Sequence, residues 1–207
     1  MPKKNNRQSS RVATASEIDA FAKGGVDTLG AGMNDEGELL VRSGPVFIDF
    51  EASSLSKRSW PIEVGLAWIE TGQVIVESKL IRPREDWPLD DWSLKSAQIH
   101  GIGLEPLEQA DSADAVAAWV LQLTGDAVLV SDAPEYDQVW LDRLLGRAGP
   151  EVRNFHDVFW LAFSHSGVIA PGRLHKVYKN RASRKSIHRA GSDAADLCYA
   201  WRAGLGK

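Results

Sequence analysis

Residues 45–52 read PVFIDFEA, an apolar and β-prone run that carries carboxylates at two alternate positions, Asp49 and Glu51. Successive side chains of a strand point to opposite faces of its sheet, so residues two apart share a face and both carboxylates project together. Adjacent carboxylates repel each other unless a cation lies between them. Mg²⁺ or Mn²⁺ fits this need better than Zn²⁺, because no cysteine or histidine cluster accompanies the acids. The alternative is that the strand frays at Phe50 and both acids are solvated.

The segments that follow have the pattern of an α/β protein. Residues 62–69 and 74–81 are strand-like and are separated by Thr71-Gly72, which suits a hairpin turn, so the first three strands are expected to be antiparallel. The apolar period then alternates between helix and strand, in residues 113–121, 127–130, 134–145, 152–158 and 193–201. This order predicts an α/β fold with a mixed sheet of about five strands flanked by helices.

The N-terminal part of the chain has a different character. Residues 1–44 are expected to form an extension, and residues 45–207 the globular domain. The extension begins with a polar, basic stretch that is predicted to be disordered. Ser16 offers an N-cap for a short helix near 16–23, which either packs on its own domain or docks a partner. The glycines and acids of residues 30–44 indicate a linker.

The composition excludes several classes of protein. A net charge of −4 with an ordinary hydrophobic content excludes global disorder, and the lone Cys198 cannot form an internal disulfide. No apolar run approaches the roughly 18 residues of a spanning helix, and the N-terminus lacks the apolar stretch of a signal peptide. A cytoplasmic location without membrane contact is therefore expected.

A second group of acids lies in residues 131–137 (SDAPEYD), where the strand at 127–130 ends and a helix begins. Ligands of α/β sheets collect beyond the carboxyl ends of strands, so Asp137 is placed where a site would form. On spacing alone, however, Asp132 fits an N-cap and Asp137 fits a first-turn acid that complements the helix dipole. Both interpretations stay open at this point.

A third group occupies residues 188–193 (HRAGSD), in which His188 precedes Asp193 by five residues. A histidine can accept a proton from water near neutral pH, and an acid beside it can hold the metal that lowers the pKa of that water. A lone His–Asp pair is more often a structural hydrogen bond. The pattern therefore gains meaning only together with the other acids.

Taken together, the three groups resemble the DEDDh family of 3′-to-5′ exonucleases in both order and spacing. The resemblance covers about residues 46–201. It implies an RNase H-like fold and two divalent ions, Mg²⁺ or Mn²⁺, in each active site. The matching positions imply that the metal ligands are Asp49, Glu51, Asp137 and Asp193. His188 would be the general base.

The second motif departs from the family pattern. Many relatives have an asparagine shortly before the aspartate, whereas this chain has Ser131, Asp132 and an apparent extra residue. The local alignment of Asp137 is therefore open, and Asp132 is the alternative ligand.

The resemblance extends to substrate contacts. His100, in residues 98–102 (QIHGI), matches a segment that many members place beside the terminal nucleotide. The alternative is that Gly101 ends a helix and His100 complements its dipole. The usual Thr-Thr-Gly after the first motif is replaced here, so a contact to the sugar would pass to Ser53 or Ser54.

A basic stretch lies directly before and within the third motif. Residues 171–192 contain lysines and arginines but no acid, so the segment can hold phosphates beside the carboxylate cluster. Arg184, Lys185 and Arg189 are the expected contacts to the nucleic acid. The alternative is a solvated helix and loop.

These observations predict a 3′-to-5′ exonuclease that hydrolyses single-stranded DNA or RNA ends to nucleoside monophosphates. The alternatives are a non-catalytic nucleic-acid-binding module on the same fold and a metal-dependent endonuclease. The expected partners are single-stranded 3′ ends, and an apolar helix face or the helix near 16–23 would support a homodimer. Preference for DNA or RNA depends on contacts that spacing does not supply.

Overall fold

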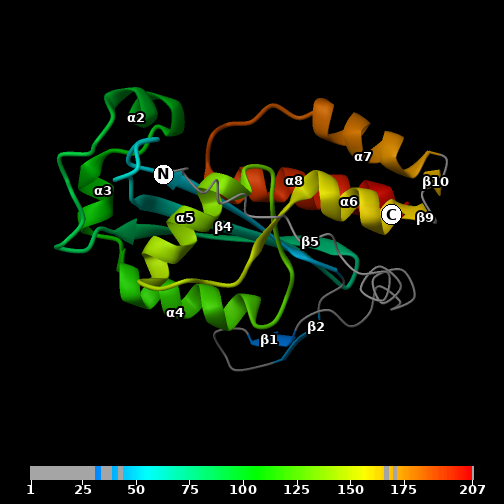
Figure 1. Ribbon diagram of the computed structural model, residues 1–207, viewed down its shortest axis with the longest axis horizontal. Coiled ribbons are helices and arrows are strands. Elements are labelled where there is room, and N and C mark those ends of the chain that lie inside the picture. Colours follow the sequence, from blue (N-terminus) through cyan, green and yellow to red (C-terminus); the bar gives the residue numbers. More distant parts are fainter. Residues whose placement is uncertain (1–30, 34–38, 42–43, 166–167, 170–171, 207) are drawn as a thin grey trace, which may run out of the picture.

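The computed structural model describes residues 31–33, 39–41, 44–165, 168–169 and 172–206. In this part of the chain a mixed six-stranded sheet is flanked by helices (Figure 1). The strands, in sheet order, are β6 (Asp111–Ser112), β5 (Gln73–Arg82), β4 (Pro61–Glu70), β3 (Val46–Ala52), β7 (Leu129–Ser131) and β8 (Val152–Asn154). The helices are α2 (Leu94–His100), α3 (Leu104–Glu108), α4 (Ala113–Thr124), α5 (Pro134–Leu145), α6 (Phe155–Phe163), α7 (Arg173–Ala182) and α8 (Ala190–Leu205). No helix in these ranges combines the length and apolar character needed to cross a bilayer.

The predicted antiparallel start of the sheet is confirmed. β3 pairs with β4 and β4 with β5 in antiparallel register, whereas β7 is parallel to β3 and β8 is parallel to β7. The hairpin between β4 and β5 turns at Thr71 and Gly72, whose φ angles are 46° and 81°. Two residues with positive φ form the tight turn whose twist matches that of the flanking strands.

The side chains of β3 alternate between two cores, and this alternation orients the acids. Ile48 and Phe50 belong to the core formed with α4 and α5, whereas Phe47 points into the core formed with α6 and α8. Asp49 and Glu51 follow the odd-numbered positions, so both carboxylates lie on the face that α8 covers. The predicted common face of the two acids is therefore present.

Helix α8 covers β3, β4 and β5, and α7 packs along α8. In Figure 1 the orange chain leaves α7 and crosses to the beginning of α8, shown in red. This connection contains the residues of the third motif that precede the helix. The chain thereby brings the start of α8 to the middle of the sheet, beside β3.

Two boundaries and the number of strands differ from the sequence prediction. The strand expected at 152–158 ends at Asn154, whose side chain accepts a hydrogen bond from the N–H of His156 and caps α6. The aromatic residues that follow recur with helical spacing and pack with α8, which favours a helix. The closing helix begins at Ala190 rather than Asp193, and the two-residue β6 adds a strand to the expected five.

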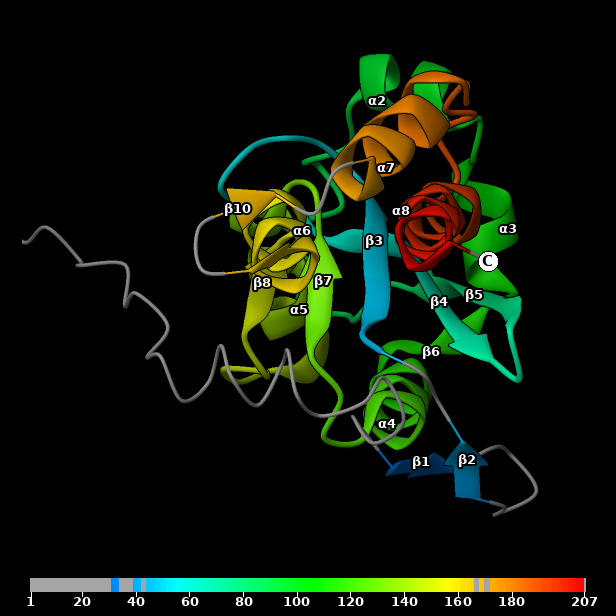
Figure 2. The same cartoon turned by 90° about the vertical axis from the view of Figure 1, so that its right-hand side faces the viewer.

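Part of the expected linker at 30–44 forms a small antiparallel pair. β1 (Ala31–Met33) pairs with β2 (Leu39–Val41), and β1 contacts α4 (Figure 2). The linker interpretation is therefore wrong for these residues, because their backbones pair with each other. A second short pair joins β9 (Ser164–His165) to β10 (Val168–Ile169). The predicted disordered lead and the helix near 16–23 lie outside the described residues, and the boundary at 44 stays a prediction.

Candidate active site

Three carboxylates from two elements meet above the middle of the sheet. Asp49 and Glu51 come from β3, and Asp193 comes from the first turn of α8. One ligand oxygen from each lies within 4.8 Å of the others. The fold therefore brings acids of the first and third motifs close together.

The close approach of α8 depends on a glycine of β4. Gly65 lies directly opposite Asp49 in the antiparallel register. A Cβ at this position would lie 2.1 Å from the carbonyl carbon of Ala190, so only glycine lets the backbone of α8 reach the strand. Asp193, one turn further along α8, is thereby held beside the acids of β3.

Asp137 reaches the same region from α5. β7 pairs with β3 only at Val46 and Phe47, so the backbone of β3 beyond this point is open to other partners. The buried carboxylate of Asp137 accepts a hydrogen bond from the N–H of Phe50 at 3.2 Å and another from the hydroxyl of Ser131. Asp137 therefore touches the strand between the two acids of the first motif.

Asp132 has a different environment. Its carboxylate pairs with the guanidinium of Arg181 on α7, and about a third of its side chain is exposed (34%). The N-cap position of α5 is Ala133, without a side-chain cap. Of the two alternative ligands, Asp137 is the one that points at β3.

The acids of the cluster repel one another electrostatically. Burial raises the pKa of Asp49 well above its usual value, and the charges of Asp137 and Glu51 raise it further. Burial and the nearby Asp193 raise the pKa of Glu51 to about 7. Burial also raises the pKa of Asp137 to about 7, against the hydrogen bond from Ser131. A cluster of this kind is stabilised by a cation that neutralises it.

His188 lies on the exposed loop before α8. Its φ is 53°, an unusual value for a residue other than glycine. Its N–H donates to the hydroxyl oxygen of Ser186 at 3.1 Å, and that hydroxyl donates to Asp193 at 3.0 Å. Burial raises the pKa of Asp193, against the smaller lowering effects of the hydrogen bond from Ser186 and of the nearby His188. The local fold thus places an exposed histidine next to the acids.

Glu63 is a residue of the site that the sequence interpretation missed. It lies opposite Glu51 on β4, and its side chain is 2% exposed. Its carboxylate accepts two hydrogen bonds from Arg189, at 2.9 and 2.8 Å, and one from the N–H of Ala190 at 3.1 Å. The available signal was an acid within the apolar strand IEVGLAW, the same signal that marked Asp49.

The predicted phosphate contacts have unequal surroundings. Arg189 is bound to Glu63, and Arg184 donates to Asp196 at 3.0 Å and stacks over the ring of Tyr199. Lys185 is exposed. Of these three cations, only Lys185 has its charge unpaired in the described part of the chain.

His100 and Ser53 are both buried. Ser53 accepts a hydrogen bond from the N–H of Trp60 at 3.0 Å and has no exposed surface, so its hydroxyl serves the local loop. His100 ends α2, and Gly101 caps the helix with a φ of 69°. The Nδ1 of His100 accepts from the N–H of Ile102, whereas its buried Nε2 has no partner among the described residues. A neutral imidazole with one unused donor results.

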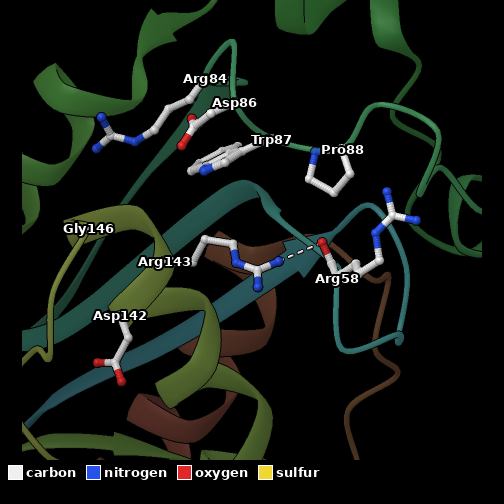
Figure 3. Close-up of a pocket in the computed structure, with 8 residues that line it drawn as sticks. All are labelled: Arg58, Arg84, Asp86, Trp87, Pro88, Asp142, Arg143 and Gly146. Atoms are coloured by element: carbon white, nitrogen blue, oxygen red, sulfur yellow. Dashed lines mark hydrogen bonds between the residues drawn. The ribbon is translucent and has the colours of Figure 1, made fainter.

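A pocket on another part of the surface contains none of the acids of the cluster (Figure 3). It is lined by Arg58, Arg84, Asp86, Trp87, Pro88, Asp142, Arg143 and Gly146. Its arginines already have partners: Arg58 pairs with Asp90, Arg84 with Asp114, and Arg143 donates to the carbonyl of Arg58. Two of the three arginines are thus ion-paired, and the guanidinium of Arg143 is held by backbone carbonyls.

The chemistry of the acid cluster fits a hard divalent cation. All donors are carboxylate oxygens, the ligand type that Mg²⁺ and Mn²⁺ prefer. Burial and the repulsion between neighbouring acids raise the pKa values of Asp49 and Glu51. Arg189 lowers the pKa of Glu51 but does not offset burial.

Comparison with known structures identifies the fold of this chain. No family model and no curated protein matches the sequence. E. coli Exonuclease I in complex with a dA16 oligonucleotide matches with a TM-score of 0.54 at 14% identity, over 76% of this chain and 39% of that protein. The nuclease domain of 3′hExo, a DEDDh family member bound to rAMP, matches with a TM-score of 0.56 at 15% identity, over 78% and 90%.

A full-length 3′-exonuclease also matches, with a TM-score of 0.57 at 14% identity, over 87% of this chain and 62% of that protein. The chain therefore spans about two fifths of Exonuclease I and about three fifths of the full-length 3′-exonuclease. At these identities the likeness establishes the architecture. The protein has the RNase H-like fold, as the sequence predicted.

Proposed function

We propose that the protein is a metal-dependent 3′-to-5′ exonuclease that hydrolyses single-stranded nucleic-acid ends to nucleoside monophosphates. The observation that carries this proposal is the meeting of Asp49, Glu51 and Asp193 within 4.8 Å on an RNase H-like fold. The nearby Asp137, which contacts β3 between the first two acids, completes the set. A binding module without catalysis has no need for a group of acids that repel one another at such close range.

The acids would hold two Mg²⁺ or Mn²⁺ ions. When bound, such ions lower the pKa of a coordinated water and stabilise charge on the attacking and leaving oxygens. Asp49, Glu51 and Asp193 would hold the ion next to the attacking water, and Asp137 would support the second. Asp137 is preferred over Asp132, because Asp132 is bound to Arg181.

His188 would remove the proton from the attacking water. The support is its place on an exposed loop beside Asp193, whose carboxylate is tied to the same loop through Ser186. An exposed imidazole can pass its proton on to solvent after each turnover.

The substrate would be held by backbone phosphates and by the terminal nucleotide. The unpaired charge of Lys185 lies in the segment that leads to His188. The buried Nε2–H of His100 is a donor that finds no acceptor among the residues that the structure describes, which supports a role beside the terminal nucleotide. The matching structures were solved with a deoxyadenosine oligonucleotide and with rAMP, so both sugars belong in the test.

The test uses single-stranded DNA and RNA labelled at either end, with Mg²⁺ or Mn²⁺. We expect early release of a labelled mononucleotide from the 3′ label and a descending ladder from the 5′ label. EDTA and the Asp49→Ala variant should abolish both. A closed circular strand should remain intact.

Two results would contradict the proposal. Cleavage of the circular strand would identify an endonuclease instead. Equal inactivity of wild type and Asp49→Ala on every substrate, with strand binding retained, would identify a binding module on the same fold.

A further inference from the structure

The beginning of α8 is fixed to the sheet by an ion pair between the buried carboxylate of Glu63 and the partly exposed guanidinium of Arg189. Arg189 is the N-cap residue of α8 and gives the helix no side-chain cap. Glu63 of β4 caps the helix instead, because its carboxylate accepts a hydrogen bond from the N–H of Ala190, the first residue of α8. The same carboxylate binds the guanidinium of Arg189 through two hydrogen bonds. Three N–H donors at the start of α8 thus donate hydrogen bonds to the single carboxylate of Glu63.

This contact lies on the face of the sheet that carries the acids. Glu63 is directly opposite Glu51, and Gly65, two residues along the same strand, is opposite Asp49. Gly65 allows the backbone of Ala190 to touch β4, and Glu63 holds that backbone by one hydrogen bond from the N–H of Ala190. These two contacts together fix where along β4 helix α8 begins. They also fix how close its first residue lies to β3.

The position of Asp193 depends on this anchor. Asp193 lies in the first turn of α8, and its N–H donates to the carbonyl of Arg189 at 3.0 Å. A shift at Arg189 would therefore move Asp193 relative to Asp49 and Glu51. His188 directly precedes Arg189 and would move with it.

We propose that Glu63 and Arg189 form a positioning pair that holds Asp193 and His188 in register with the acids of β3, so that Arg189 serves the metal site rather than a phosphate of the substrate. The role of the pair in catalysis rests on the proposed function. Its role in metal binding does not, and can be measured without a substrate. A positioning pair of this kind typically changes metal affinity by about 10 to 100-fold when it is broken.

The test measures Mn²⁺ binding to the metal-free protein by titration calorimetry, without any nucleic acid. The variants are Glu63→Gln, Arg189→Gln and the double variant, with Arg189→Lys as a milder change should one of them fail to fold. Asp111→Asn is the matched control, because it removes a carboxylate from a 2.9 Å ion pair with Lys79 at the edge of the same sheet. Circular dichroism and thermal unfolding confirm that each variant is folded.

We expect each single variant to raise the Kd for Mn²⁺ about 10 to 100-fold. The Kd of the double variant should exceed the larger of the two single-variant values by no more than about twofold, because both substitutions break the same contact. The KM for an oligonucleotide at saturating Mn²⁺ should stay close to that of wild type. The control should bind Mn²⁺ normally. A merely structural role would lower the melting temperature without changing the affinity for Mn²⁺.

Unchanged Mn²⁺ affinity in both folded single variants would overturn the proposal. So would a rise in the oligonucleotide KM of Arg189→Gln alone, because Arg189 would then contact the substrate. If wild type binds Mn²⁺ and the variants weaken that binding, but no nucleic acid is cleaved, the positioning pair stands and the proposed exonuclease function fails.

Discussion

The carboxyl groups of Glu51 and Asp137 each have a pKa raised to about 7, and that of Asp49 is raised strongly as well. In the unfolded chain such groups titrate near pH 4. Between about pH 4 and 7 the folded protein therefore keeps protons that the unfolded chain has lost. The stability contributed by these groups is present at low pH and is lost as the pH rises through the folded pKa.

We accordingly expect the metal-free protein to melt several degrees lower at pH 8 than at pH 5.5. Thermal unfolding in EDTA at several pH values measures this difference. The variant Asp49→Asn should reduce it, because one of the mutually repelling charges is gone. A melting temperature that rises steadily from pH 5.5 to pH 8 would show that the acids are not strained as described.

The two candidate ligands of the second motif can be separated by single substitutions. Asp137→Asn keeps the shape of a buried side chain that contacts Phe50, but removes the charge. We expect it to lower kcat about 100-fold or more, because charge stabilisation by a bound metal is worth several kcal/mol.

Asp132→Asn is the paired experiment. Its ion pair with Arg181 is about one third exposed, so we expect a change in kcat below about fivefold. Steady-state kinetics on one labelled oligonucleotide compares the two. The opposite order of effects would make Asp132 the ligand.

At the scale of the elements, α7 presents cations to solvent. Arg173, Lys176 and Lys179 recur every three residues and are exposed, and they have no ion pair within the described ranges. Arg181 and Arg184, by contrast, are paired with acids. Because α7 leads toward His188, we expect these cations to hold phosphates upstream of the terminal nucleotide.

We expect Lys176→Glu/Lys179→Glu to raise the KM of a ten-nucleotide strand while leaving hydrolysis of a dinucleotide unchanged. The salt dependence of binding should become shallower by about 1.4 in the log–log slope, since each lost phosphate contact removes about 0.7. The double variant Arg82→Glu/Arg147→Glu changes the same number of exposed charges elsewhere and is the control. If the two double variants change the KM and the salt dependence equally, α7 does not contact the substrate.

At the scale of the whole molecule, the site exists only when distant elements are joined. β3, α5 and α8 supply its acids, and β4 supplies Glu63 and Gly65. The unfolded chain has no such arrangement, so a divalent ion held by these acids would bind only the folded state and would stabilise it.

Mn²⁺ at about 100 times its Kd should therefore raise the free energy of unfolding by about 2.7 kcal/mol. Urea unfolding with and without Mn²⁺ measures the increase. Asp49→Ala should lose it. An increase that survives in this variant would place the binding of Mn²⁺ elsewhere.

Local patterns in the sequence determined much of this protein. The alternation in residues 45–52, the Thr71-Gly72 turn and the change from strand to helical period predicted the sheet and its antiparallel start. Such features depend on neighbours along the chain, which the sequence displays directly. The three acids that meet were also marked by their sequence positions.

The tertiary structure alone decided which charges face one another. Arg189 was expected at a phosphate, yet it binds Glu63, a residue far away in the sequence. The sequence did not decide whether Asp132 or Asp137 is the better candidate ligand. In the folded protein Asp132 pairs with Arg181 of α7, whereas Asp137 accepts a hydrogen bond from the N–H of Phe50 in β3. Partner choice follows from packing between distant segments, and the periodicity of one segment contains no information on what packs against it.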